Sequence, residues 1–279
     1  MLNLIRKISI AVIAIMLVTV TIFSWSLFKK SSKLTLTGST TVLPIAQAAA
    51  ESYMKGKGKG TEITVNGGGS SVGIAAILDG RADIGNASRD AKSKEIESGK
   101  AKGIDLYQNV IALDGIAVVC SKDVNVDNLT KEQVKEIFAG KINNWKEVGG
   151  TDAEIVVVSR DTSSGTYGSF VEMVLEKDKM RADAQMVASN QAMATTVAAT
   201  PNSIGYLGLG FLKSADVKPI KIDGVMPSEK TVKDKTYPIS RTLNMYTNGK
   251  PTGDVAKFIN FILSAQGQKI VEEQGFIKL

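Results

Sequence analysis

Short apolar runs alternate with segments of helical periodicity from about residue 33 to the end of the chain. Alternation of this kind predicts an α/β fold in which mainly parallel sheets are covered by helices on both faces. The length of 279 residues suits two such domains. The strand-like runs are 34–38, 61–69, 106–121, 154–160, 203–212 and 237–249.

Two features of the pattern predict individual helices. Thr130 is followed three residues later by Gln133, and this capping box marks a helix that begins at residue 131. Apolar residues recur at helical spacing from residue 254 to residue 275, which predicts one long amphipathic helix that closes the chain.

The N-terminal segment 1–33 is set apart from this pattern. Its apolar run from Ile8 to Phe28 carries no charge and is long enough to cross a bilayer as a helix. The run ends in bulky residues, which make a poor cleavage site. We therefore favour an uncleaved membrane anchor, with a signal peptide removed near Ser31 as the alternative. Both predict export, either to the outer face of the cytoplasmic membrane or, after cleavage, to the periplasm or medium.

Composition excludes several kinds of chemistry. The chain has no histidine, so Ser-His-Asp and Cys-His catalysis and histidine-metal sites are ruled out. Cys120 is the only cysteine and reads as a small buried hydrophobe on a strand. The carboxylates lack the spacing of metal loops, so we expect neither a metal nor a cofactor. The net charge of +6 comes from lysines interspersed with acidic residues, which favours general attraction of anions over nucleic-acid binding.

Three strand-to-helix junctions share glycines and hydroxyl side chains. They lie at 38–41, 67–73 and 159–166. Ligands of open α/β sheets bind beyond the carboxyl ends of strands, and helix N-termini attract anions. Arg160 adds the bidentate donor that a phosphate-like group favours. One such junction alone is more often an ordinary helix cap, but three together predict an oxyanion site.

Hydroxyls in such a place can attack a substrate or hold a ligand. No G-x-S-x-G elbow surrounds Ser163 or Ser164, and no Walker-type phosphate loop occurs. No S-x-x-K motif is seated at these helix starts, which leaves a serine–lysine arrangement without support. The sequence therefore favours hydroxyls that bind a ligand over hydroxyls that attack a substrate, and it predicts no catalytic residue.

Several longer motifs resemble one family. The segments GSTTVLPIAQAAAE, VNGGGSSVGIAAILDGRADIGNASRD, FAGKINNWKEVGG, SRDTSSGT, NSIGYLG and YTNGKPTGDVAKFINFILSAQGQKIVEEQGF are similar to the phosphate-binding proteins of phosphate ABC importers, the PstS-like family. The resemblance covers the chain from about Leu34 onward. It implies a monomeric type II periplasmic binding protein with lobe one at 34–117 and 238–279 and lobe two at 118–237. It also implies closure over one phosphate ion and delivery of that ion to a membrane permease.

The family's ligand positions carry over by matching motif. The resemblance implies phosphate contacts from Ser39, Thr40, Thr41, Ser70, Ser71, Arg160, Ser164, Gly165 and Thr166. Thr162 and Ser163 are expected only to cap the helix.

The NASRD turn departs from the family pattern. Better-known members place a carboxylate there that accepts the proton of the bound phosphate, whereas this chain has Arg89 followed by Asp90. Asp90 and Asp161 are the candidates for the proton acceptor, and Ser88 and Arg89 for direct contacts with the anion.

Three alternative functions stay open from the sequence. The first is a receptor for another tetrahedral oxyanion such as sulfate or molybdate, and the second is a phosphate-binding sensor or surface protein. The third is an anchored phosphoryl hydrolase that uses Ser164 or Thr166, which the absence of histidine disfavours.

Overall fold

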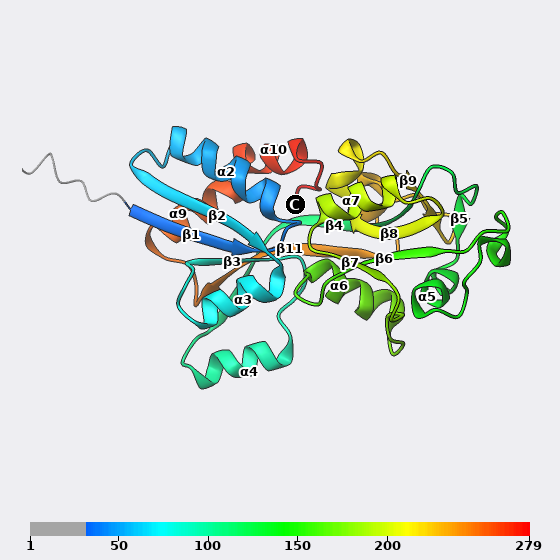
Figure 1. Ribbon diagram of the computed structural model, residues 1–279. Helices are drawn as coiled ribbons and strands as arrows, with labels where there is room; N and C mark the ends of the chain where they lie inside the picture. Colours follow the sequence, from blue (N-terminus) through cyan, green and yellow to red (C-terminus); the bar gives the residue numbers. More distant parts are fainter. Residues whose placement is uncertain (1–31) are drawn as a thin grey trace, which may run out of the picture.

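The computed structural model describes residues 32–279, which form a mixed nine-stranded sheet flanked by helices (Figure 1). The strands lie in the order β2 (Thr61–Gly68), β1 (Ser32–Gly38), β3 (Ile84–Ala87), β11 (Ser240–Asn248), β4 (Leu106–Cys120), β8 (Ser203–Gly208), β6 (Val156–Arg160) and β7 (Gln185–Val187), with β9 (Lys218–Pro219) also paired to β4. The predicted α/β class is confirmed. The outer pairs of each half are parallel, but every pair that includes β4 or β11 is antiparallel.

Helices cover the sheet on both faces. They are α2 (Leu43–Lys55), α3 (Ser70–Leu78), α4 (Ser93–Ala101), α5 (Lys131–Ala139), α6 (Gly165–Phe170), α7 (Asn190–Ala199), α8 (Glu229–Lys233), α9 (Gly253–Leu263) and α10 (Ala265–Glu273). In Figure 1, α2 and α10 lie above the first strands, and α3 and α4 lie below them. A small separate sheet pairs β5 (Asn128–Leu129) with β10 (Lys221–Ile222).

Two large hydrophobic cores divide the molecule into lobes. The first core packs β1, α2, α9 and α10 and includes Leu36, Ile45 and Phe258. The second packs β6, β8, α5 and α6, and its centre is a cluster of Phe138, Phe170 and Tyr206. The rings of Phe170 and Tyr206 stack with their centroids 4.0 Å apart. Each lobe therefore has its own core.

The two long strands β4 and β11 connect the lobes. On β4, Ile111 belongs to the first core and Val118 to the second. Leu243 of β11 packs in the first core, whereas Ile239, just before this strand, packs in the second. Figure 1 shows both strands passing from one half to the other. The chain thus crosses between the lobes on two adjacent, paired strands.

The capping box at α5 is confirmed. The amide of Gln133 donates to Thr130 Oγ1 at 3.0 Å, and the amide of Thr130 donates to Gln133 Oε1 at 2.8 Å. Cys120 is fully buried on β4, and burial raises the pKa of its thiol to about 12. The thiol is therefore protonated and inert at neutral pH.

The long closing helix was a wrong prediction, because the chain breaks at Ser264 into α9 and α10. Ser264 is extended, with ψ at 164°, and its hydroxyl accepts from the amide of Gly267 to cap α10. Gly267 packs so closely that a Cβ there would lie 2.2 Å from the carbonyl oxygen of Phe261. The break lets α10 fold back and place Val271 in the first core.

The predicted strand 203–212 also ends early, at Gly208. There the amide of Gly208 donates to Asn190 Oδ1 at 3.1 Å, and the amide of Leu209 donates to Asp114 Oδ1 at 3.0 Å. Side-chain acceptors thus take the backbone donors away from the sheet ladder, and a 3₁₀ turn at Leu209–Ser214 follows.

The expected anchor or signal peptide lies almost entirely in residues 1–31, which are outside the described part of the chain. Within residues 32–279, no helix combines the length and the apolar character needed to span a bilayer.

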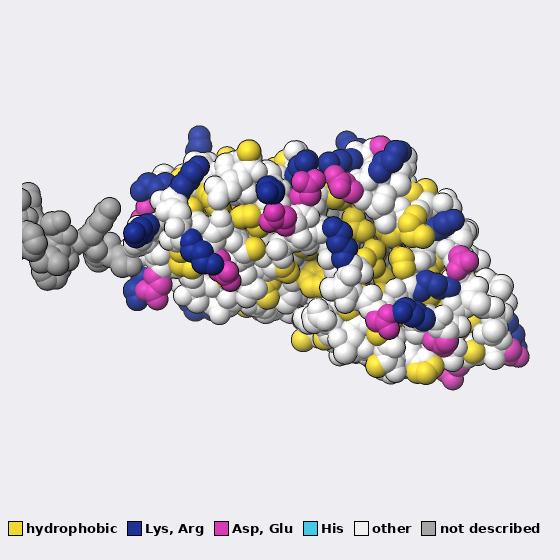
Figure 2. Space-filling model, turned by 90° about the horizontal axis from the view of Figure 1, so that it is seen from above, with side chains coloured by type: hydrophobic (Ala, Val, Ile, Leu, Met, Phe, Trp, Pro, Cys, Tyr) yellow, Lys and Arg dark blue, Asp and Glu magenta, His cyan; other side chains and the backbone are white. Residues whose placement is uncertain are grey.

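The charge of the described residues is spread over the surface. Figure 2 shows lysines and arginines interspersed with acidic side chains on the face seen from above. Many of them pair, as Lys33 does with Glu62 at 3.0 Å and Lys233 with Glu229 at 2.7 Å. These exposed pairs contribute little to stability individually.

The aromatic cluster of lobe two supports a stability prediction. Replacing Phe170 by alanine removes a fully buried ring, so Phe170→Ala should lower the free energy of unfolding by about 3–5 kcal/mol in urea titrations. Met186→Ala, at a side chain that is 53% exposed, is the control and should change it by less than about 0.5 kcal/mol. Equal losses in the two variants would contradict the assigned core.

Candidate functional site

The three hydroxyl-rich junctions meet at one place between the lobes. They follow β1, β2 and β6 and begin the helical segments α2, α3 and α6. The amide of Gly69 donates to the carbonyl oxygen of Gly38 at 2.8 Å, and the amide of Ser71 donates to that of Ser163 at 3.0 Å. Thr41 Oγ1 lies 3.1 Å from Thr166 Oγ1. The structure therefore brings together the junctions that the sequence suggested would share a site.

Local hydrogen bonds give each junction its shape. Ser39 Oγ accepts from the amide of Thr41 at 3.1 Å, which turns the chain after β1. Ser164 is the N-cap of α6, and its hydroxyl oxygen accepts from the amide of Tyr167 at 3.2 Å. A capping serine keeps its hydroxyl hydrogen free to donate to a ligand. Ser163 was expected to be a cap. Its hydroxyl oxygen instead lies 3.1 Å from the carbonyl oxygen of Gly68, a contact between the two lobes.

Two glycines allow close approach between the lobes, Gly69 to the backbone of Ser163 and Gly165 to the side chain of Ser70. Gly69 has a φ of +97°, and a Cβ there would lie 2.6 Å from the carbonyl oxygen of Ser163. At Gly165, a Cβ would lie 2.0 Å from Ser70 Oγ and 2.8 Å from Ser70 Cβ. A larger residue at either position would push the two lobes apart.

Arg160 brings a buried positive charge to this place from the end of β6. Its Nε donates to the carbonyl oxygen of Val187 at 3.1 Å, and its Nη2 donates to that of Ala188 at 3.0 Å and to Thr40 Oγ1 at 3.2 Å. Its Nη1 is buried and has no hydrogen-bond partner in the part of the chain that the structure describes. Burial lowers the pKa of Arg160, and nearby Asp161 opposes that change. A buried charged donor without an acceptor is costly, so Arg160 Nη1 is a candidate donor for an anion. Arg89 Nε and Arg181 Nη1 are also buried without a partner among the described residues, but Arg160 alone of the three is bonded to a hydroxyl of the first junction.

Contacts from the Arg160 guanidinium lead to hydroxyl groups of both lobes, through Thr40 to Thr41 and Thr166. Asn190 Nδ2 donates to Thr41 Oγ1 at 2.9 Å and lies 3.3 Å from Thr40 Oγ1. Ser70 Oγ accepts from the amide of Ser88 at 3.0 Å. Most of the set is almost completely buried, namely Ser39, Thr41, Ser70, Ser88, Ser164 and Thr166. Together with Thr40, Gly165 and Arg160, these residues make up what we call the hydroxyl cluster.

Arg89 and Asp90 of the NASRD turn contact neighbouring side chains. The guanidinium of Arg89 binds both carboxylate oxygens of Glu95, at 2.7 and 2.8 Å, and donates to Ser71 Oγ at 3.0 Å. Asp90 is exposed and accepts from Gln108 Nε2 at 2.8 Å. Arg89 thus bonds to Ser71, Glu95 and the backbone of Asp90, and the Asp90 carboxylate bonds to Gln108, instead of to the hydroxyl cluster. A local partner, Glu95 in the first turn of α4, decides the direction of Arg89.

Asp161 is also occupied by a local contact. Its Oδ1 accepts from the amide of Ser163 at 2.9 Å and from the hydroxyl of the same residue. Neither candidate for the proton acceptor therefore points an unengaged, buried carboxylate at the hydroxyl cluster.

Three residues of the site escaped the sequence reasoning. Arg241 of β11 forms an ion pair with Asp114 of β4 at 2.7 Å, and its Nη2 donates to Thr166 Oγ1 at 3.1 Å. Asn190, at the start of α7, is the third. The available signal for Arg241 and Asp114 was a single charged residue within each of two predicted strands, since a buried charge must find a partner.

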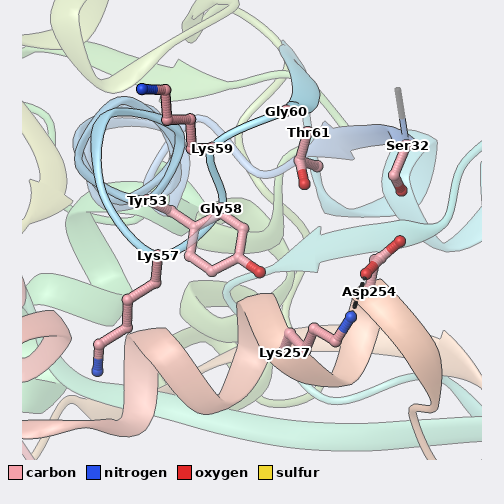
Figure 3. A pocket seen from close by; sticks show the side chains of 9 residues that line it. All are labelled: Ser32, Tyr53, Lys57, Gly58, Lys59, Gly60, Thr61, Asp254 and Lys257. Atoms are coloured by element: carbon pink, nitrogen blue, oxygen red, sulfur yellow. Dashed lines mark hydrogen bonds and ion pairs between the residues drawn. The ribbon is translucent and has the colours of Figure 1, made fainter. Parts of the chain in front are cut away.

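Other places in the described chain offer less. Within residues 32–279, no group of three or more carboxylates and cysteines is arranged to hold a metal ion. A hollow of about 350 Å³ is lined by Tyr53, Lys57, Lys59 and Lys257, with Ser32 and Thr61 at its edge (Figure 3). Ser32 and Thr61 are the first residues of β1 and β2. The hollow therefore lies at the amino ends of these strands, whereas the hydroxyl cluster lies beyond their carboxyl ends.

Comparison with known sequences places the chain in a family. A model of the PBP superfamily domain matches residues 29–266. The phosphate-binding protein PstS of Bacillus subtilis is 37% identical over 250 residues, which cover 89% of this chain and 81% of that protein. PstS of Borreliella burgdorferi is 38% identical over 251 residues, 86% of this chain and 88% of that protein. The chain belongs to the PstS family of phosphate-binding proteins.

Solved structures agree with this membership. A putative phosphate ABC transporter substrate-binding protein from Clostridium perfringens, with bound phosphate, has a TM-score of 0.82 at 37% identity and covers 89% of this chain and 100% of its own. An ABC-type phosphate transport receptor from Vibrio cholerae has a TM-score of 0.73 at 33% identity, covering 88% and 100%. The family resemblance and the periplasmic-binding-protein fold predicted from the sequence are confirmed.

The close approach at Gly165 can be tested by a single methyl group. Gly165→Ala should weaken binding of inorganic phosphate, used as the probe, by about 1–3 kcal/mol, because Ser70 Cβ cannot rotate out of the way. Isothermal titration measures this, and circular dichroism checks the fold. Gly56→Ala is the matched control, since a Cβ there meets only the carbonyl oxygen of Ser52 at 3.4 Å. Wild-type affinity in Gly165→Ala would show that the lobes do not close as described.

Proposed function

We propose that this chain captures inorganic phosphate between its two lobes and delivers it to an ABC importer. The observation that carries the proposal is the buried, unpartnered Nη1 of Arg160 amid hydroxyls from both lobes. Phosphate presents several acceptor oxygens, and a guanidinium with hydroxyl donors matches them. Membership of the PstS family supports phosphate as the anion.

The lobes that we propose follow the sequence boundaries, 34–117 with 238–279 and 118–237. Ile116 and Ile239 fall in lobe one by these boundaries but pack in the second core. The division between the lobes therefore lies slightly before residue 116 on β4 and slightly after residue 239 at β11. Closure would be a hinge motion on β4 and β11, the two strands that cross between the lobes. The direct contacts between Thr41 and Thr166 and between Ser71 and Ser163 are those of a closed form.

The ligand residues that we propose are those of the hydroxyl cluster. Ser39, Thr40, Thr41, Ser70 and Ser88 come from lobe one, and Arg160, Ser164, Gly165 and Thr166 come from lobe two. Both lobes must contribute to a complete set of donors, which ties binding energy to closure. Ser71, Arg89 and Asp90 would support the turn instead of touching the anion.

Binding here proceeds without catalysis. The Ser164 hydroxyl accepts a backbone hydrogen bond as the cap of α6, and Thr166 Oγ1 lies beside Thr41 and Arg241, neither of which is a base. A hydroxyl nucleophile needs an adjacent base to lose its proton. The hydrolase alternative therefore lacks its central element, and the family consists of binding proteins.

The place of action that we propose is the outer side of the cytoplasmic membrane. Binding proteins of this family serve an importer, so the partner is a membrane permease that recognises the closed form. The N-terminal apolar segment would keep the protein close to that permease if it stays attached.

Isothermal titration tests the proposed function directly. The segment 32–279 suits this test, because both cores lie within it and the solved relative from Clostridium perfringens corresponds over its whole chain to 89% of this one. We expect tight one-to-one binding of phosphate and much weaker binding of sulfate and molybdate. Heat with sulfate or molybdate but none with phosphate would contradict the proposal and favour a receptor for another oxyanion.

Arg160→Ala tests the charge at the centre of the site. Loss of a buried charge-assisted pair should weaken phosphate binding by about 2–5 kcal/mol. Arg81→Ala, at an exposed arginine paired with Asp79, is the control and should leave the affinity unchanged. Unaltered phosphate binding in Arg160→Ala would place the site elsewhere.

A further inference from the structure

A second buried arginine stands beside the hydroxyl cluster on the strands that connect the lobes. Arg241 of β11 and Asp114 of β4 are direct cross-strand partners. Arg241 Nε and Nη2 donate to Asp114 Oδ2 at 3.0 and 2.7 Å, and the two side chains are 3% and 0% exposed. A buried ion pair of this kind can have a purely structural role in holding two strands together. The other contacts of Arg241 decide whether it has a further role.

The remaining donors of Arg241 point at the cluster. Nη1 donates to the carbonyl oxygen of Ser88 at 3.0 Å. Nη2 lies 3.1 Å from Thr166 Oγ1 and 3.4 Å from Thr41 Oγ1, one hydroxyl from each lobe. One hydrogen of Arg241 Nη2 is donated to Asp114, and its second hydrogen is shared between the hydroxyls of Thr41 and Thr166 over longer distances. An anionic oxygen among these hydroxyls would be a better acceptor for that hydrogen.

The carboxylate is held on the far side of the guanidinium. Asp114 Oδ1 accepts from the amide of Leu209 at 3.0 Å, and the amide of Gly115 also bonds to this carboxylate. The pair is therefore oriented, with its positive end at the cluster and its negative end toward the backbone of β8 and β4. Arg241 is also close enough to Arg160 for its charge to lower the pKa of that residue, in addition to the larger effect of burial. Two guanidinium groups thus face one set of hydroxyls.

We propose that Arg241 is a second anion-binding arginine of this site and that the Asp114 carboxylate partly neutralises its charge. The inference rests on the proposed phosphate-binding function and adds a ligand residue that belongs to neither lobe's helix starts but to the connecting strands. A bound phosphate oxygen would take the hydrogen of Nη2 that Thr41 and Thr166 now share. The anion would then bridge Arg160 of lobe two and Arg241 of the hinge, so the hinge itself would sense the ligand.

Three variants separate this role from a purely structural one. In Asp114→Asn, the anion becomes the main counter-charge of Arg241, so phosphate should bind at least as tightly as in the wild type, although thermal unfolding occurs at a lower temperature. In the double variant Asp114→Asn with Arg241→Met no buried charge is left unpaired, yet phosphate should bind about 10- to 100-fold more weakly because a charged hydrogen bond is lost. Arg241→Lys keeps a cation beside Asp114 without the planar fork, and should also bind more weakly.

Isothermal titration of the segment 32–279 with inorganic phosphate gives the result, with thermal unfolding as the check of the fold. The exposed pair Asp79 and Arg81, changed to Asn and Met in the same way, is the matched control and should bind as the wild type does. Wild-type affinity in the double variant would overturn the inference, as would an equal loss in Asp114→Asn and in the double variant. If the double variant does not fold, wild-type affinity in Arg241→Lys overturns it instead. Absence of binding in the wild type would defeat the proposed function itself, which is a different result from any of these.

Discussion

The guanidinium of Arg160 is buried at the boundary of the two lobes with one nitrogen that no described group accepts from, and the site is arranged around this unmet charge. Burying a charge without a partner is unfavourable by several kcal/mol, so the surrounding fold has to hold it there. The carbonyl oxygens of Val187 and Ala188 fix two of its nitrogens, and the third, Nη1, is buried without a partner among the described residues. In the function that we propose, an anion bound here removes this cost and so favours closure of the lobes.

The candidate site also depends on the two strands that connect the lobes. β4 and β11 pair with each other and connect the two cores, so the hinge that we propose lies beside Asp114 and Arg241. These side chains contact Thr41 on one lobe and Thr166 on the other. Gly69 and Gly165 let the lobes pack closely, against the backbone of Ser163 and the side chain of Ser70 respectively. The connecting strands, the buried Arg241 and the contacts between the lobes thus lie next to one another.

Much of this could be predicted from the sequence, where the determining interactions are local. The strand-to-helix junctions, the capping box at Thr130 and the position of Arg160 at the end of β6 all depend on neighbours a few residues away. Arg241 and Asp114 are 127 positions apart, and their pairing depends on a strand register that no local pattern reveals. The direction of Arg89 depends on Glu95, a partner that competes with any ligand. The break at Ser264 is accompanied by packing of α10 against the first core through Ile270 and Val271. Tertiary contacts explain the Arg241 pair and this packing, whereas the contact of Arg89 with Glu95 is local.

The most direct test of the account is the position of the anion itself. Arsenate has the shape and charge of phosphate, and its arsenic atom is located without ambiguity by anomalous X-ray diffraction. In crystals grown with arsenate, we predict one anomalous peak between the lobes, with arsenate oxygens in hydrogen-bond distance of Arg160 Nη1 and of the hydroxyls of Thr40 and Thr166. A peak confined to surface lysines, such as those of the loop at 56–60, with an empty boundary between the lobes, would contradict the account.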